Sequence, residues 1–585
     1  MKKIILYFAV AATCLLPACS KKEVPVQEAS ANLFYIQAQG GEATKAAIDN
    51  TSAAFTWSAG DQIAVYTTDG YKKSVALTEG GSASASFAFD EDIDDARADF
   101  ALFPANLVFD GDTPRGCASE HTADELDIVV PDSYTLAQVQ GDASPVYMVA
   151  ANAPGDPLAF KQMGALLRIK VQYIPKDAQT LKVTFPGQKV QGLFALFDFA
   201  AGDGIPAEDG DEDTITITDL GISEFTDALI INIPVPCGVN AKYVRVGAYD
   251  STNHKINSID APIKEVESVP TAWKPARKAA RKVVASLPYF TTNRKTNKKV
   301  VFAPGNVQGT ITVAANSTDK VGSANSWRFA EHQYDALGDC SGNRLEKVGD
   351  PIDLFAWVGE SATKSYSTNQ RYGVLWPVRS SGQNGGSHPE KVKYSWADLF
   401  NGVTYPANTW RLFNGDKEGE ETKTETEVLT TSRGVPYMST KATIKDGSSV
   451  VARGLILFPD NYVHPYGVKA LVKYGVEADI KGCHYAENEL TLAEWDLLEK
   501  VGGCAFLPVT GVRSLVSSAM DTSKYFGEAA YWNDFSNSTS QAAGMMVSDT
   551  DYCPDTFADS KTNIAPRKSI NRANGLAVRL IRDVN

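Results

Sequence analysis

Short runs with apolar residues at alternating positions dominate the first half of the chain. Phe55 and Trp57 stand two residues apart before a glycine-containing turn, and Ile63 follows it. This is the pattern of a strand, a tight turn and a second strand. Helical periodicity is weak here, so the pattern predicts a β-rich first half. Further strands are predicted at residues 33–38, 82–89, 100–103, 146–150, 165–173, 181–185, 214–218, 229–235 and 243–249.

The second half mixes helix signals with strand signals. Thr491 and Glu494 have the spacing of a capping box, in which each side chain bonds the backbone N–H of the other residue. Leu492, Trp495 and Leu498 then share one face of the helix that follows. The mixture predicts a compact α+β unit. Its other predicted parts are strands at 454–459, 504–508, 544–547 and 576–581, a short helix at 394–400 and a solvated loop at 417–427.

The chain begins with a segment that has the form of an export signal. Two lysines precede an apolar run from Ile4 to Leu16, which is too short to span a bilayer. The run ends in Leu16-Pro17-Ala18-Cys19, which resembles a bacterial lipobox. The resemblance implies that residues 1–19 are a lipoprotein signal, that Cys19 carries acyl chains such as palmitate, and that residues 20–32 are a tether. An ordinary secretory signal with a chance cysteine is the alternative.

Composition bounds the class of protein. A chain of 585 residues is too long for one core and suggests three or four domains. Hydrophobic residues make up 43%, which excludes wholesale disorder. The net charge of -14 argues against non-specific binding to nucleic acid.

Cysteine spacing leaves two interpretations open. Six cysteines remain once Cys14 and Cys19 are set aside, and no CxxC pair is among them, which disfavours zinc-ribbon and thioredoxin folds. An exported protein is free to form disulfides, and Cys483 and Cys504 would close a short loop. Buried free thiols fit the spacing equally well.

Two charged stretches lie in the second quarter of the chain. The acidic run 208–213 lacks the spacing of an EF-hand loop, so a solvated loop is favoured over a calcium site. The basic cluster at 274–282 is unusual in an acidic protein. We interpret it as the exposed start of a closing strand that ends at Pro288. A protease site and a contact with an acidic partner are the functional alternatives.

Four β motifs follow one another along the first part of the chain. They are Phe55-x-Trp57-x-x-Gly60-Asp61, Phe100 to Ala105, Leu158-x-Phe160 to Val171, and Gly192-x-Phe194 to Phe197. Their order and spacing resemble the fimbrillin family of Bacteroidetes. The resemblance implies two transthyretin-like β-sandwich domains, at residues 33–156 and 157–287. It also implies assembly into pili by strand donation, in which a protease removes the first strand and another subunit fills the groove.

The family's cleavage site matches this chain only in part. In fimbrillins the cut commonly follows an arginine, whereas the matching position here is Lys45, followed by Ala46. The resemblance therefore implies a maturation cleavage between Lys45 and Ala46, provided that the protease accepts lysine. Retention of the first strand is the alternative.

Residues 288–585 are similar to the C-type-lectin-like folds, which include glycan-binding adhesins and formylglycine-generating enzymes. The similarity rests on the runs Phe506 to Arg513, Tyr531-Trp532 and Asn574 to Leu580. Trp532-Asn533-Asp534 spells a triplet of calcium-dependent lectins, which makes Asn533 and Asp534 weak calcium candidates. The partner motif of those lectins is absent, so a core tryptophan followed by a polar turn is favoured.

No enzyme motif stands out. The chain has neither HExxH nor GxSxG, and the surroundings of Cys504 and Cys553 do not resemble the formylglycine-generating site. The sequence therefore predicts a lipid-anchored pilus subunit at the outer membrane, without a cofactor. Its predicted partners are other fimbrial subunits and a host or bacterial surface glycan or protein.

A position at the pilus tip is favoured over the stalk. The last apolar segment, 576–581, is expected to be built into its own domain and unavailable as a donor strand. A surface glycan-binding lipoprotein outside any pilus is the alternative, and a formylglycine-generating type of enzyme is a third.

Overall fold

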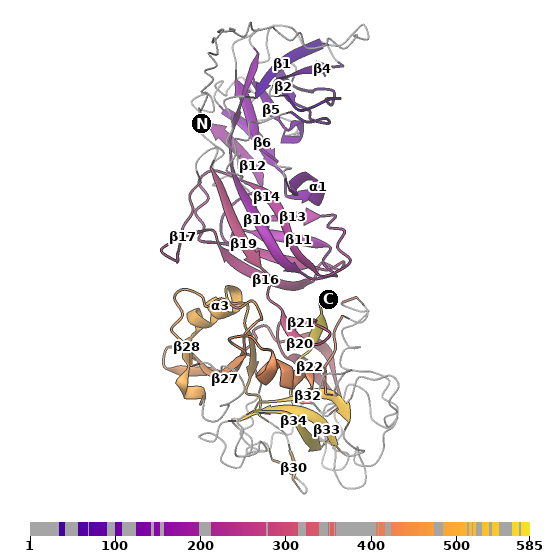
Figure 1. Cartoon of the computed structure of the whole chain (residues 1–585), viewed down its shortest axis with the longest axis vertical. Coiled ribbons are helices and arrows are strands. Elements are labelled where there is room, and N and C mark those ends of the chain that lie inside the picture. Colours follow the sequence, from indigo (N-terminus) through magenta and orange to yellow (C-terminus); the bar gives the residue numbers. More distant parts are fainter. Residues whose placement is uncertain are drawn as a thin grey trace, which may run out of the picture.

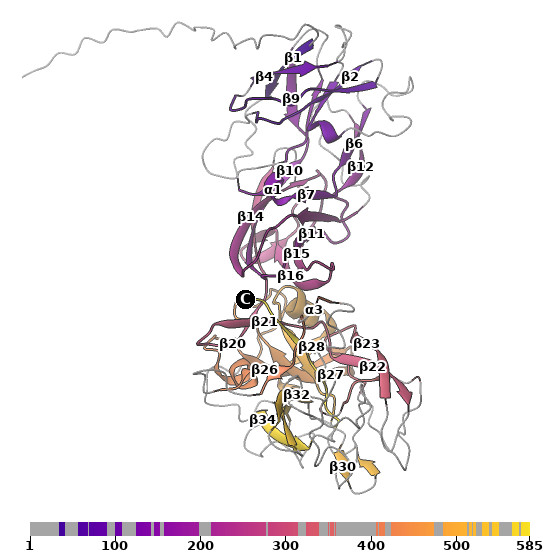
Figure 2. The same cartoon turned by 90° about the vertical axis from the view of Figure 1, so that its right-hand side faces the viewer.

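The computed structural model is mainly β, and its three units follow one another along the longest axis (Figure 1). The view turned by 90° shows the same order, with β1 at one end and the C-terminal domain at the other (Figure 2). Among the described residues, no helix is long and apolar enough to cross a membrane. The structure describes residues 34–40, 57–67, 70–82, 84–90, 100–107, 125–141, 145–151, 157–197, 212–275, 279–313, 323–337, 349, 351–355, 357, 405–406, 409–415, 423–472, 484–511, 514–516, 519–521, 529–536, 541–548, 564–571 and 575–585.

The first unit is built on a seven-stranded sheet with the strand order β3-β2-β5-β8-β9-β1-β4. A two-stranded sheet, β6 with β12, packs against one of its faces. The strands of the unit are β1 (Phe34–Gly40), β2 (Ala64–Thr67), β3 (Gly70–Lys73), β4 (Ser84–Phe89), β5 (Phe100–Phe103), β6 (Glu125–Val130), β8 (Met148–Ala151), β9 (Leu158–Gln162) and β12 (Gly192–Phe197).

Both faces of the seven-stranded sheet are buried. On one face Ala64 packs with Ile128 and Phe194 from the small sheet. On the other face Ile63 packs with Trp57 in a second core. Successive residues of a strand point to opposite faces, which is why neighbours in sequence join different cores. The strand predicted after the turn is confirmed as β2, whereas residues 55–56 of the strand predicted before it lie outside the described residues.

The second unit is a sandwich of a three-stranded sheet, β14-β10-β19, and a five-stranded sheet, β16-β15-β11-β13-β7. Alternate residues of β10, among them Leu167 and Ile169, point into the single core between the sheets. The predicted strands 214–218 and 243–249 coincide with β13 and β15. The strands are β7 (Ser133–Thr135), β10 (Ala165–Ile174), β11 (Thr180–Thr184), β13 (Thr214–Thr218), β14 (Thr226–Val235), β15 (Tyr243–Tyr249), β16 (Lys255–Pro262), β19 (Ala280–Ser286) and the hairpin β17 (Lys264–Val266) with β18 (Val269–Thr271).

The chain passes repeatedly between these two units. β7 lies before the predicted boundary at 156/157 but pairs with β13 of the second unit. β9 lies after the boundary but pairs with β8 and β1 of the first. β12 then returns to pair with β6. At the junction, beside the short helix α1 (Leu136–Val139), the buried hydroxyls of Tyr134 and Tyr147 share a hydrogen bond that joins the two cores. The boundary therefore does not divide the strands of the two units.

The third unit, from residue 288 onward, combines several small sheets with short helices. Its helix α3 (Leu492–Lys500) confirms the predicted capping box, because Thr491 and Glu494 bond each other's backbone N–H. Trp495 and Leu498 are buried on its inner face. The other elements are β20 (Phe290–Asn293), β21 (Lys298–Phe302), β22 (Val307–Val313), β23 (Ser323–Phe329), β24 (Pro351–Ile352), β25 (Phe413–Asn414), α2 (Glu425–Glu427), β26 (Ser439–Asp446), β27 (Ser449–Leu457), β28 (Glu489–Thr491), β29 (Ala505–Pro508), β30 (Ser514–Val516), β31 (Ala519–Asp521), β32 (Ala529–Ser536), β33 (Gln541–Val547), β34 (Ile564–Asn571) and β35 (Ile581–Asp583).

Two predictions for this unit were wrong in part. Residues 576–581 are buried as expected, but Leu576 and Ala577 make only isolated bridges, and the regular strand is β35 at residues 581–583. The predicted solvated loop at 417–427 ends in α2, where Thr424, Glu425 and Thr426 are buried. The charged and threonine residues suggested a solvated loop. The sequence does not show that Glu425 pairs with Arg411, which comes from another segment, and can therefore be buried. The helix predicted at 394–400 lies outside the described residues.

Candidate functional site

The first strand has neighbours on both sides in its sheet. β1 pairs with β4 in antiparallel register over six residue pairs, from Phe34↔Phe89 to Gln39↔Ser84. On its other side it pairs with β9 in parallel register over three pairs that begin at Ala38↔Leu158. β4 ends the sheet, so β1 is its one sheet neighbour among the described strands. Removal of β1 would leave β4 and β9 with unpaired backbone groups that face each other across a slot.

The core beside this slot is aromatic. The Trp57 ring makes edge contacts with Phe87 of β4 and Phe160 of β9, with ring centroids 4.9 and 5.5 Å apart. Phe103 lies 5.1 Å from the same ring. Phe87 and Phe160 are fully buried. An incoming strand would therefore find both backbone hydrogen-bonding groups and an apolar surface, which is the chemistry of strand addition.

Three residues of the predicted lipidation and cleavage sites lie outside the described residues. These are the lipidation candidate Cys19 and the two residues of the predicted cleavage site, Lys45 and Ala46. The chain leaves β1 at Gly40 and is next described at Trp57, so the predicted cleavage site falls in the connection that follows β1. The lipid anchor and the cleavage remain predictions.

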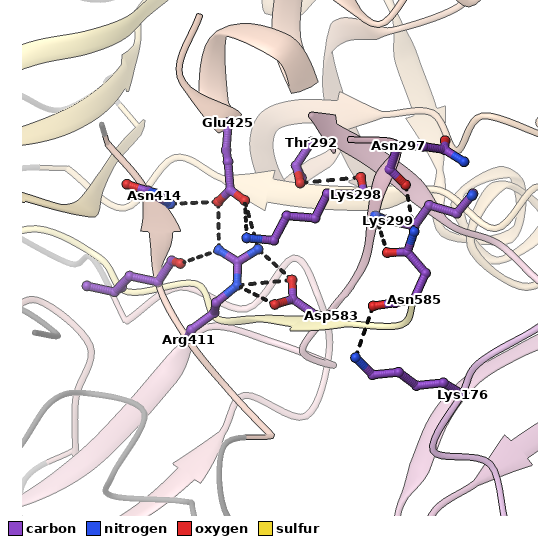
Figure 3. Close-up of polar contacts among 11 residues, drawn as sticks. Lys176, Thr292, Asn297, Lys298, Lys299, Arg411, Asn414, Glu425, Asp583 and Asn585 are labelled. Carbon is purple, nitrogen blue, oxygen red and sulfur yellow. Dashed lines mark hydrogen bonds and ion pairs between the residues drawn. The ribbon is translucent and has the colours of Figure 1, made fainter. Parts of the chain in front are cut away.

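The last described strand is held by a charge cluster within its own domain. β35 pairs with β21, and Arg411 lies beside it between two carboxylates (Figure 3). The Arg411 guanidinium donates to both oxygens of Glu425 at 2.7 and 2.8 Å and to Asp583 Oδ1 at 2.6 Å. Burial alone would lower the pKa of Arg411, but attraction to Glu425 and the hydrogen bonds to both acids outweigh burial and raise it. Bidentate pairs of this kind are among the strongest polar contacts in proteins.

Residue 585 is held by a side chain of the second unit and by backbone groups of the third. Lys176 of the second sandwich donates from Nζ to the Asn585 carbonyl oxygen at 2.9 Å (Figure 3). The Asn585 side chain donates to the Asn297 carbonyl oxygen at 2.6 Å and accepts the backbone N–H of Lys299 at 2.8 Å. The end of β35 is therefore tied both to the β20–β21 turn and to the second sandwich.

A buried ion pair joins the second and third units. Arg582 Nη1 lies 2.8 Å from Asp250 Oδ2, and the two side chains are only 3% and 1% exposed. Burial would raise the pKa of Asp250, but hydrogen bonds from Arg582, Thr252 and His254 lower it overall. Val584, two residues after Arg582, belongs to the core of the second sandwich. The C-terminal domain is therefore fixed to the second sandwich through the segment that ends the chain.

Cys504 lacks the surroundings of a reactive thiol in the described part of the chain. Cys504 is a free cysteine, 2% exposed, and burial together with the nearby Glu499 raises the pKa of its thiol. Its predicted partner Cys483 lies outside the described residues, so the described part of the chain does not contain the predicted bridge. A buried thiol with a raised pKa is a poor nucleophile.

The calcium candidates sit on a core strand. Trp532 and Asn533 of β32 are fully buried, and Asn533 donates from Nδ2 to Thr426 Oγ1 at 3.3 Å. Asp534 is half-buried and continues the same strand, so the polar turn expected after the tryptophan is absent. Within the described ranges, no group of three or more His, Cys, Asp or Glu residues is placed to hold a metal ion.

Sequence reasoning missed the charge clusters around β35. Arg582 and Asp583 interrupt an apolar run between Ile581 and Val584. Two charged residues inside such a run were the one sequence signal for a buried charge cluster. Their partners Asp250 and Arg411 are remote in sequence, so nothing local identified them.

Comparison with known proteins gives only weak likenesses. No family model and no curated protein matches the chain. A candidate cell adhesion protein from Bacteroides ovatus is 10% identical, with a TM-score of 0.26, over 43% of this chain and 91% of that chain. The tip fimbrial protein Mfa3 of Porphyromonas gingivalis is 8% identical, with a TM-score of 0.20, over 44% and 94%. A fimbrial protein from Bacteroides ovatus is 10% identical, with a TM-score of 0.18, over 93% and 98%. These TM-scores are low, so the likenesses do not assign the chain to a family.

Proposed function

We propose that the protein is a lipid-anchored cell-surface fimbrial subunit that occupies the end of a fibre and presents its C-terminal domain for attachment. In this role it accepts a strand from a neighbouring subunit and donates none. The role is non-enzymatic, and the ligand of the C-terminal domain is a glycan or a protein on a host or bacterial surface.

One observation carries the position at the end of a fibre. A donor strand has to leave its own subunit and enter a neighbour's groove. Here the C-terminal strand β35 is paired with β21, tied to Arg411 and Lys176, and followed by Val584 in the core of the second sandwich. Releasing it would expose buried charges and apolar surface at the same time, which carries a high free-energy cost. A terminal subunit has no need to release it.

The acceptor role rests on the place of β1. Removal of this strand opens a slot between β4 and β9 that is lined by the aromatic cluster around Trp57. A strand from another subunit would restore both ladders. The connection after β1 contains Lys45, where the proposed protease would cut.

The test is the N-terminus of the mature protein, taken from the native cell surface and determined by mass spectrometry. A start at Ala46 supports the proposal. A matched pair of variants sharpens the result: Lys45→Gln should retain a lipidated Cys19, whereas Lys22→Gln in the tether should be processed like the parent protein. A lipidated Cys19 on all surface copies of the parent would contradict strand exchange and favour a glycan-binding lipoprotein outside any pilus.

A further inference from the structure

The strands β14, β10 and β19 lie side by side in one sheet (Figure 1). On its outer face Lys170, Lys282 and Val284 are exposed, Arg168 is half-buried and Asn232 is buried. Ile169 and Val171 of β10 point into the sandwich core, so their neighbours point outward. The pairing registers place three residues of each strand side by side on this outer face. Its rows are Asn232–Arg168–Lys282, Ile230–Lys170–Val284 and Ala228–Gln172–Ser286.

The charged members of this array are all cations. Arg168 is directly paired with Lys282, and Lys170 is the next outward residue along β10. None of the nine positions carries a carboxylate. Within the described ranges, none of the three cations makes an ion pair or a side-chain hydrogen bond. The net charge of the whole chain is -14, so this face is opposite in sign to the molecule as a whole.

Several other cations among the described residues do pair with a carboxylate. Arg245 pairs with Asp260, Lys445 with Glu489 and Lys500 with Asp496. Like charges on directly paired strand positions are destabilising. Placing Arg168 beside Lys282 with no intervening acid therefore works against the stability of the isolated sandwich, which favours a contact with another molecule over a structural role.

Apolar side chains stand among these cations. Val284 is paired with Lys170 and is 56% exposed, and Ile230 on the other side of Lys170 is half-exposed. A protein surface can bury such side chains and supply carboxylates at the same time. An anionic polysaccharide supplies carboxylates but offers little apolar surface to Val284.

We infer that this face, defined by Arg168, Lys170, Lys282 and Val284, docks an acidic, partly apolar surface of a neighbouring protein subunit. The contact lies on the side of the second sandwich, separate from the β1 slot and from the C-terminal domain. It adds a lateral partner to the proposed function and does not depend on which end of a fibre the chain occupies.

The test uses a zero-length carbodiimide cross-linker on cells that display the full chain, followed by mass spectrometry of the linked peptides. Such a reagent joins a lysine only to a carboxylate in direct contact. We expect Lys170 and Lys282 to be linked to Asp or Glu of another protein in higher yield than Lys242, an exposed lysine of the same sandwich. High ionic strength should lower the yield, because it screens exposed charges.

Variants of Arg168 leave both reactive lysines in place. Arg168→Glu should lower the yield at Lys170 and Lys282 by roughly tenfold, because charge reversal turns attraction of an acidic partner into repulsion. Arg168→Gln should give an intermediate yield, and Arg168→Lys should retain it. Lys242→Glu is the matched control and should leave the yield unchanged. Thermal melting of each variant reports whether the sandwich is folded.

Three results would overturn the inference. The first is a yield at Lys170 and Lys282 no higher than at Lys242. The second is a yield that Arg168→Glu and Arg168→Gln, both folded, leave unchanged. The third is a product in which the lysines are joined to uronic acids of a polysaccharide or only to carboxylates of the same chain.

Discussion

The guanidinium of Arg582 and the carboxylate of Asp250 lie 2.8 Å apart in the interior, although 332 positions separate them in sequence. Asp250 follows β15 in the second sandwich, and Arg582 is the middle residue of β35 in the C-terminal domain. Their contact fixes the orientation of the C-terminal domain on the second sandwich. If either side chain moved into water, the other would be left as a buried charge without this partner.

Breaking this pair from one side should be strongly destabilising. Asp250→Asn leaves the buried Arg582 charge with only the half-exposed carboxylate of Asp177, 3.4 Å from Nη2, so we expect a loss of about 3 kcal/mol in the free energy of unfolding. Chemical denaturation of the full chain measures it. The control is Lys500→Gln, which removes an exposed pair with Asp496 and should cost about 1 kcal/mol or less. Equal losses for the two variants would contradict the assignment of a buried anchor.

The junction tyrosines should show a non-additive response. Tyr147→Phe leaves the buried Tyr134 hydroxyl without its partner, which should cost about 1–3 kcal/mol. The double variant Tyr134→Phe/Tyr147→Phe removes both hydroxyls and should recover most of that loss. Thermal unfolding of the single and double variants decides the matter, and additive losses would mean that the hydroxyls do not act as a pair.

Asp353 should make stability depend on pH. Burial raises the pKa of this carboxyl from 3.8 to about 6. Because the folded-state pKa lies above the unfolded-state value, the folded protein binds more protons between about pH 4 and pH 6. The free energy of unfolding should therefore gain up to about 3 kcal/mol from this group as the pH falls through that window. Asp353→Asn should lose this gain, and unfolding curves of parent and variant at pH 7 and pH 4.5 would reveal it.

Loosening the Arg411 cluster should expose the last strand to exchange. Glu425→Gln removes one of the two carboxylates that hold Arg411, so we expect faster hydrogen exchange at the backbone amides of β35. Glu489→Gln, which removes a partly exposed pair with Lys445, serves as the control and should leave that exchange unchanged. Unchanged exchange in the Glu425 variant would show that β35 is held by its backbone pairing alone.

The first half of the fold was predictable because its signals are local. Alternating apolar residues specify the two faces of a strand, and β13 and β15 begin and end at the predicted residues. The helix α3 was predictable for the same reason, since its capping box spans only four residues. The way the strands are divided between the first two units was not predictable. No local pattern indicates that β7 pairs with β13 or that β12 pairs with β6.

Of the candidate site, only the existence of β1 as the first strand could be predicted from the sequence. β1 was expected as the first strand, and its place between β9 and β4 follows from long-range pairing that the sequence does not express. The cluster at β35 joins Arg411 to a residue 172 positions away. Charged side chains such as Glu425 therefore looked like loop residues, although the structure buries them against a distant partner.

The repeated passage of the chain between the first two units has a consequence for the order of folding. The first unit lacks β12 until residue 197 is available, while the second unit already needs β7 from residue 133 onward. The core of the second unit is completed by Val584, which follows the whole C-terminal domain. A chain that emerges from the N-terminus onward therefore cannot finish its domains one at a time. The second unit can complete its core only when Val584 is available, at the same stage as β35 of the C-terminal domain.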